Sequence, residues 1–157
     1  MNPCRCGYFG DVNRSCNKVP RCKQEYQSKI SGPLLDRIDL HTEVPYVNLL
    51  SIQKSDMISE DTATVKKRII AAREMQSKRY KDKSFKINSD LNGEDLIKFV
   101  HFDHKIKELL QKLIEERSLS PRGYSRLLKV ARTIADLNGS EEVLREHFLE
   151  ALVYRPN

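Results

Sequence analysis

The clearest periodic pattern of apolar residues lies in the last third of the chain. After Ser120-Pro121, apolar side chains recur at helical spacing up to Leu137, and Asn138-Gly139 follows. Serine followed by proline is typical of a helix start, because the serine oxygen caps the first turn and proline lacks an amide donor where none is needed. Asn-Gly is typical of a helix end. The buried face of this predicted helix holds Tyr124, Leu127, Leu128, Ala131, Ile134, Ala135 and Leu137.

The same periodicity predicts two helices before it. One begins near Ser59 or Asp61, and a short helical piece covers Glu94 to Val100. The apolar face of the first is formed by Val65, Ile69, Ala72 and Met75.

Two more helices complete the predicted bundle. One is capped by Asp103 and the other, after the long helix, by Ser140. In the helix after Asp103, the residues predicted to face the core are Ile106, Leu109, Leu110, Leu113 and Ile114. In the last helix, the residues predicted to face the core are Val143, Leu144, Phe148, Ala151 and Leu152. Residues 59–157 are therefore predicted to be a bundle of four or five helices.

The first part of the chain lacks this periodicity. Residues 1–29 carry Gly, Asn and Pro among their cysteines, which predicts a loop. Residues 40–45, LHTEVP, alternate between apolar and polar side chains and end at a proline, which predicts a short strand. Residues 46–58 have no periodicity and are predicted to be a linker.

Composition narrows the class of partner. The 157 residues are 39% hydrophobic and carry a formal charge of +6, which favours nucleic acid or nucleotide phosphates. No apolar run approaches the ~20 residues needed to cross a bilayer, and the N-terminus does not resemble a secretory signal. A cytoplasmic location without a membrane partner is expected.

The predicted helix after Asp61 has a basic face. Such a face is often simply solvated, but clustered lysine and arginine also displace counterions from nucleic-acid phosphates. The residues that would contact nucleic acid are Lys66, Lys67, Arg73, Lys78 and Arg79.

The four cysteines, at positions 4, 6, 16 and 22, allow two interpretations. Four thiolates could close a tetrahedral zinc site and hold a long loop together. The spacing argues against this, since Cys-x-Cys is tighter than usual and five residues separate Cys16 from Cys22. Reduced, metal-free thiols are the alternative, because a structural disulfide is not expected in a reducing cytoplasm.

Three stretches resemble one family. They are MNPCRCGYFGD at 1–11, KISGPLLDRIDLHTEVP at 29–45 and LSPRGYSRLLKVARTIADLNG at 119–139. Together they resemble the magnesium-chelatase-like AAA+ ATPases of the competence protein ComM type. The resemblance implies a mainly α fold, in which residues 1–45 end an α/β AAA+ core and residues 59–157 form its helical lid.

The resemblance also implies roles for single residues. Asn2 would be the sensor 1 residue, Arg37 the arginine finger, and Arg122 the sensor 2 arginine that contacts the nucleotide. An ion-paired surface arginine is the alternative for Arg37, which lies between two aspartates. The family tends to carry a second Cys-x-Cys, where this chain has Lys18. That departure puts the zinc site in doubt.

For the complete protein, the resemblance implies ATP and Mg²⁺ as cofactors, a hexameric ring of identical subunits, and action on DNA such as branch migration. No glycine here begins the Gly-x4-Gly-Lys-Ser/Thr pattern that cradles phosphates, and no acidic cluster follows an apolar strand. We therefore expect a C-terminal piece of the ATPase. Such a piece depends on the remainder of the core, holds no cofactor tightly by itself and does not hydrolyse ATP alone.

A second interpretation comes from a different class of protein. The absent phosphate loop and the basic helix also suit a stand-alone helical protein that binds nucleic acid or serves as an adaptor. In that case residues 1–29 would form a cysteine-rich N-terminal arm.

Overall fold

A computed structural model describes residues 2, 4–9, 16–35, 37–44, 60–102, 106–108, 110–111 and 119–155. The chain divides into two compact units, Met1–Ile38 with Thr42–Ile58, and Asp39–His41 with Ser59–Asn157. The predicted linker at residues 46–58 lies outside the described residues. No helix in the described part of the chain is long and apolar enough to cross a membrane.

The described residues of the first unit include two short helices, α1 (Arg21–Gln27) and α2 (Gly32–Leu35). The prediction of a loop throughout residues 1–29 was therefore wrong for α1. Its sequence, RCKQEYQ, is rich in unbranched side chains that favour helix, and Arg21 pairs with Glu25 one turn later at 3.4 Å. Among the described residues of this unit, only Cys4 and Cys16 are buried.

The predicted strand does not form. Leu40 to Val44 have no regular secondary structure, and no strand lies beside them among the described residues. An isolated strand is unstable because its backbone groups need a neighbouring strand. Instead, the amide of His41 donates to the carbonyl of Tyr154 at 2.8 Å, within the second unit.

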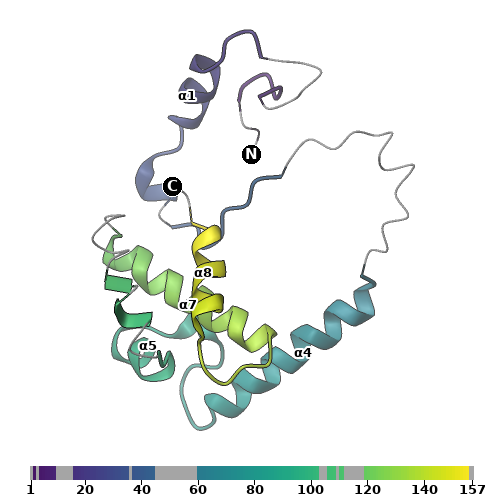
Figure 1. The fold of residues 1–157 in the computed structure, drawn as a ribbon, viewed down its shortest axis with the longest axis vertical. Helices are drawn as coiled ribbons and strands as arrows, with labels where there is room; N and C mark the ends of the chain where they lie inside the picture. Colours follow the sequence, from purple (N-terminus) through teal and green to yellow (C-terminus); the bar gives the residue numbers. More distant parts are fainter. Residues whose placement is uncertain are drawn as a thin grey trace. The chain divides into compact units, whose positions relative to one another are not determined.

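The second unit is a bundle built around one helix, which confirms the mainly α fold. The elements of its described part are α4 (Thr62–Arg79), the 3-10 turn η1 (Asn88–Asp90), α5 (Gly93–Phe99), α7 (Pro121–Leu137) and α8 (Arg145–Val153). Helix α7 contacts α4, α5, α8 and η1 (Figure 1). The core of the unit therefore surrounds α7.

Both ends of α7 lie where the sequence predicts them. The Ser120 hydroxyl accepts from the Gly123 amide at 3.0 Å, and Gly139 follows the C-terminal cap with a φ of +70°. The predicted buried face is confirmed at Leu127, Leu128, Ala131, Ile134 and Ala135, and Tyr124 packs against it. Leu137 is exposed, contrary to prediction, because Asp136 takes the inward position of the last turn.

Helix α4 also starts as predicted but packs through one half only. Its N-terminal cap is Asp61, whose carboxylate accepts from the Thr64 amide at 2.9 Å. Ala72 and Gln76, in the C-terminal half, are its only buried residues. Ile69 is 47% exposed, so its predicted burial was wrong, because the N-terminal half of α4 is not covered by other described residues (Figure 1).

The start of α8 was predicted four residues too early, since Leu144 rather than Ser140 is its N-terminal cap. Arg132 donates to the carbonyls of Ser140 and Glu141, at 2.5 and 2.7 Å, and this holds the connection in a non-helical form. The helix begins only at Arg145. Leu144 is exposed, whereas Val143, Phe148 and Ala151 are buried and Leu152 packs against the core.

The two remaining predicted helices, at Glu94 to Val100 and after Asp103, agree with the structure where their residues are described. Helix α5 agrees with the short piece predicted at Glu94 to Val100. For the helix after Asp103, Ile106 and Leu110 are buried as predicted. Asp103, Leu109, Leu113 and Ile114 lie outside the described residues.

A network of buried polar groups joins three elements of the bundle. The Asp136 carboxylate, 1% exposed, accepts from Arg79 on α4, Arg132 on α7 and Asn88 on η1. Arg132 is equally buried, and Asn88 also accepts from the Tyr80 hydroxyl at 2.6 Å. Two guanidinium groups thus share one carboxylate away from water.

Replacing Asp136 should reveal how much the bundle depends on this network. Asp136→Asn keeps the side-chain volume but leaves two partly or fully buried arginines without a counter-charge. We expect the free energy of unfolding to fall by about 3–5 kcal/mol, measured by urea denaturation. Glu60→Gln is the matched control, because Glu60 pairs with Arg68 at the surface and should change stability by less than about 1 kcal/mol. Equal, small effects of the two changes would contradict the structural role of Asp136.

Candidate functional site

The four cysteines converge in the first unit. Cys4 and Cys6 come from the N-terminal loop, Cys16 from the turn before α1, and Cys22 from α1 itself. Their sulfur atoms all lie within 4.8 Å of one another, and the Sγ atoms of Cys4 and Cys6 are 3.2 Å apart. A tetrahedron with zinc–sulfur bonds of about 2.3 Å has sulfur–sulfur edges of about 3.8 Å. The four thiols are thus close enough together that they could hold a metal ion.

Backbone turns bring these thiols together. The Gly7 amide donates to the Cys4 carbonyl at 3.1 Å, and Gly7 has a φ of +82°, which glycine adopts without strain. The Cys22 amide donates to the Lys18 carbonyl at 2.8 Å. The two turns position the thiols without relying on an apolar core.

The thiols have different acidities. Burial raises the pKa of Cys4, but hydrogen bonds from the Cys6 thiol and from three backbone amides outweigh it and lower the pKa to about 7. The Tyr8 amide lowers the pKa of Cys6, yet the Cys4 and Cys16 thiols raise it to about 11. The amides around Cys4 therefore favour a thiolate, which is the form that binds metals.

Spacing along the chain could not decide between the two interpretations of these cysteines. The usual separation of two to four residues describes two ligands within one short turn. Here the four thiols come from three separate segments, so the tight Cys-x-Cys and the wide gap before Cys22 are both compatible with one cluster. The donor set, four thiolates, is typical of structural zinc.

Arg122 is exposed in the first turn of α7, directly after the Ser120 cap. The next residue, Gly123, is buried, and a Cβ atom there would lie 2.8 Å from the Arg155 guanidinium. Sequence analysis missed both Gly123 and Arg155. The signal was a glycine inside a helix, where it is otherwise unfavourable and often marks a close approach.

A second feature missed from the sequence attaches a short segment to the same helix. Asp39 pairs with Arg126 on α7 at 2.9 Å, one turn after Arg122. Together with the His41–Tyr154 hydrogen bond, this pair explains why Asp39–His41 belongs to the helical unit.

Asn2 and Arg37 lie in the first unit and are both exposed. The Arg37 amide donates to the Leu34 carbonyl at 3.0 Å, so the residue closes the turn after α2. Leu34 and Ile38 beside it are 49% and 42% exposed. The structure thus presents Arg37 on a partly apolar surface.

The basic face of α4 is only partly as predicted. Lys66, Lys67, Arg73 and Lys78 are exposed. Arg79 has a side chain only 16% exposed, and its guanidinium donates to Asp136. Arg79 therefore serves the core, whereas the other four basic side chains remain at the surface.

Two family models match the chain. The model described as magnesium chelatase, subunit ChlI C-terminal, matches residues 59–155, and the model described as magnesium chelatase, subunit ChlI, matches residues 1–52. The first match ends at residue 52 and the second begins at residue 59. Both limits lie within residues 45–59, which the structure does not describe.

Curated relatives align with nearly the whole chain. An uncharacterized protein YifB of Salmonella typhimurium and the competence protein ComM of Haemophilus influenzae are each 37% identical to it, over 155 and 156 residues. An uncharacterized protein of Mycobacterium tuberculosis, Rv2897c, is 30% identical over 154 residues. The alignments cover 98–99% of this chain, and the chain spans 29–30% of the length of these relatives.

The unequal acidities of the thiols give a testable pH dependence. The pKa of Cys4 lies near 7, below its ordinary value of 9.0, so one thiolate should form as the pH rises through 7 in the reduced, metal-free chain. Thiolate absorbance in the ultraviolet should follow this step. By linkage, the resulting stabilisation is complete above pH 9 and is lost as the pH falls through 7.

Two variants identify the group that titrates. Cys4→Ala should abolish the step near pH 7, whereas Cys22→Ala should preserve it, because Cys22 is not among the groups that lower the pKa of Cys4. A single transition near pH 9 in the unsubstituted chain would overturn this assignment.

Proposed function

Because the chain belongs to the magnesium chelatase ChlI C-terminal family, we propose that it is the C-terminal portion of a ring-forming AAA+ ATPase of the ComM type. In this proposal the remainder of the AAA+ core supplies the phosphate-binding loop and the magnesium ligands. The chain described here supplies sensor 1, the arginine finger and sensor 2. ATP hydrolysis would drive DNA remodelling or branch migration by a hexamer.

The placement of Arg122 carries this proposal. The first turn of a helix has amides without helical partners and the positive end of the helix dipole, so it attracts phosphate. An exposed guanidinium in that turn adds a second source of positive charge. Arg122 is proposed to contact a nucleotide phosphate as the lid closes.

The surroundings of Arg37 support its role as a finger. Phosphoryl transfer accumulates charge on the γ-phosphate oxygens, and an arginine supplied by another protein accelerates it by roughly 10³–10⁵ in GTPase examples. Such an arginine must be exposed on its own subunit. Exposed Leu34 and Ile38 beside it suit a surface that a neighbouring subunit covers. Asn2 would orient the attacking water.

The cysteine cluster is proposed to hold a structural zinc ion through Cys4, Cys6, Cys16 and Cys22. A fourth protein ligand leaves no open position, so the ion would supply a cross-link and no catalysis. The first unit has few buried apolar residues among those described, which makes such a cross-link important for its folding.

The exposed basic residues of α4 are proposed to contact DNA phosphates. Lys66, Lys67, Arg73 and Lys78 lie at the surface, where they can displace counterions. The same residues would serve a stand-alone nucleic-acid-binding protein. The two functions differ in whether Arg37 and Arg122 affect ATP turnover.

Arg37→Ala in the complete ATPase separates catalysis from folding. We expect kcat to fall by about 10³-fold or more, because the transition-state charge loses its partner. Nucleotide affinity and thermal stability should hardly change, since an exposed arginine contributes little to folding. Steady-state turnover, nucleotide binding and thermal unfolding measure the three quantities.

Mixed rings provide the control for action between subunits. Rings that combine Arg37→Ala subunits with subunits lacking the phosphate-loop lysine should regain part of the activity. In such rings some junctions pair an intact arginine with an intact nucleotide site. Unchanged turnover in the Arg37→Ala protein, or its unfolding, would make Arg37 a structural residue.

Metal analysis tests the cysteine cluster separately. The chain purified with zinc should hold one ion per molecule by mass spectrometry under native conditions. Cobalt(II) should replace zinc and give the visible absorption of a tetrahedral thiolate complex. Cys22→Ser should weaken metal binding by 10-fold or more, whereas Ser28→Ala, just after the same helix, should not change it. A chain that stays free of metal while its thiols are reduced would refute the zinc proposal.

A further inference from the structure

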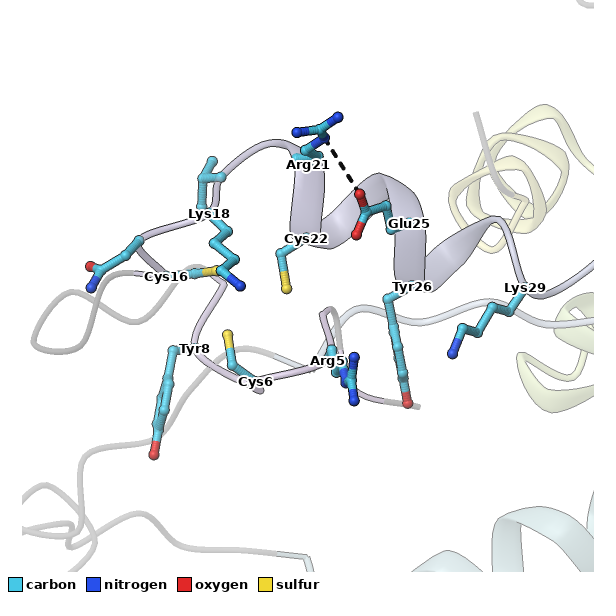
Figure 2. A pocket seen from close by; sticks show the side chains of 12 residues that line it. Arg5, Cys6, Tyr8, Cys16, Lys18, Arg21, Cys22, Glu25, Tyr26 and Lys29 are labelled. Carbon is cyan, nitrogen blue, oxygen red and sulfur yellow. Dashed lines mark ion pairs between the residues drawn. The ribbon is translucent and has the colours of Figure 1, made fainter.

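The cysteine cluster forms one wall of a hollow in the first unit. The hollow has a volume of about 1020 Å³, and α1 and the N-terminal loop contribute its lining (Figure 2). Besides three of the cysteines, four basic residues and two tyrosines line it. They are Arg5, Lys18, Arg21, Lys29, Tyr8 and Tyr26.

The side chains around this hollow carry a net positive charge. The described residues of 4–35 include five basic side chains, and Glu25 is the acidic one. Among the described residues, the Glu25 carboxylate forms its ion pair with Arg21, in an exposed contact at 3.4 Å. Four thiolates around a divalent cation carry two negative charges, so a bound metal would not cancel the basic excess. The hollow therefore attracts an anion.

Aromatic side chains lie among the basic ones. Tyr8 is 41% exposed and Tyr26 is half-buried. Figure 2 shows both tyrosine rings directed to the same side of the hollow, with Arg5 between them. Cations alternating with flat rings are the combination that binds single-stranded nucleic acid, since phosphates contact the cations and bases stack on the rings.

The cysteine ligands determine where these side chains lie. Arg5 is between Cys4 and Cys6 in the sequence, and Arg21 directly precedes Cys22. Tyr26 follows Cys22 by four residues in α1, which places both on one face of the helix. A metal that fixes the four thiols would therefore also fix the cations and rings around the hollow.

We propose that this hollow binds a single-stranded segment of nucleic acid. Its lysines and arginines contact the phosphates, and Tyr26 stacks on a base. Paired bases within a duplex are stacked on one another and cannot present a face to Tyr26, so single strands should be preferred. An acidic peptide could use the cations but would gain little from the ring. The inference rests on the proposed function, in which nucleic acid is the substrate.

Fluorescence anisotropy with a labelled oligothymidylate and the zinc-loaded chain tests the proposal. Tyr26→Ala should weaken binding by about 5-fold or more, whereas Tyr26→Phe, which keeps the ring, should bind normally. The double variant Lys18→Ala, Lys29→Ala should weaken binding further. It should also reduce the slope of log K against log[salt] by about 1.4, the value for two phosphate contacts with a single strand. Zinc content and circular dichroism verify that each variant is folded.

A matched variant on the other basic surface distinguishes the two sites. The double variant Lys66→Ala, Lys67→Ala on α4 should weaken the binding of a labelled DNA duplex more than the binding of oligothymidylate. If this change abolishes single-strand binding while the Tyr26 and Lys18/Lys29 variants bind normally, the hollow is not the site. The proposal would be overturned if Tyr26→Ala and Tyr26→Phe changed the affinity for oligothymidylate equally. It would also be overturned if the chain bound poly-glutamate as tightly as oligothymidylate, or if the folded chain did not bind oligothymidylate at low salt.

The assay contains no ATP, so its failure is distinct from failure of the ATPase proposal. Normal turnover of the Arg37→Ala protein would refute the arginine finger but leave the hollow unaffected. If the Arg37→Ala protein loses catalysis but Tyr26→Ala binds oligothymidylate normally, only the proposal that the hollow binds single strands is refuted.

Discussion

The helical unit depends on a single desolvated carboxylate. Asp136 is buried on the central helix α7 and faces guanidinium groups from Arg79 and Arg132. Burial lowers the pKa of Arg132, and the nearby Asp136 opposes that effect, which keeps the arginine charged in the interior. Two cations and one anion can share this space only while their geometry is maintained. The network thereby fixes the end of α4, the turn η1 and the connection to α8 against α7.

The first unit is organised by different physics. It has almost no apolar interior among its described residues, and its two helices bury no residue. With the proposed zinc ion bound, four thiolates brought together by backbone turns would take the place of a core. A unit of this kind is held by the chemistry of a few atoms, so its surface is free to be basic and aromatic. The helical unit, in contrast, uses charge internally to hold its elements together.

Sequence reasoning succeeded where a position could be judged from its immediate neighbours. Ser120, Pro121 and Gly139 define the ends of α7 through local backbone chemistry, and the apolar stripe at Leu127, Leu128 and Ala131 follows from helical period alone. It failed where a partner distant in sequence decides the outcome. Arg79 looked like one more basic surface residue, since nothing local indicates that Asp136, 57 residues later, accepts from it.

The same distinction explains the remaining errors and applies to the cysteines, whose metal binding stays a prediction. Ser140 has the local features of a cap, but Arg132 holds its carbonyl and delays the helix. Ile69 has the right period, but no described element covers that half of α4. The cysteines were judged by their separation along the chain, although three segments that meet in space provide them. Periodicity describes one element at a time, whereas these features depend on how elements meet.

The attachment of Asp39–His41 to the helical unit affects where the protein can be cut. A fragment that starts at Ser59 matches the apparent boundary but removes the acid that pairs with Arg126 and the amide that donates to Tyr154. Arg126, with a side chain only 20% exposed, would then face a vacated surface. A protease that cleaves between His41 and Ser59 would leave the short segment held by noncovalent contacts alone. The helical unit is therefore discontinuous along the chain, and a fragment that lacks Asp39–His41 lacks part of that unit.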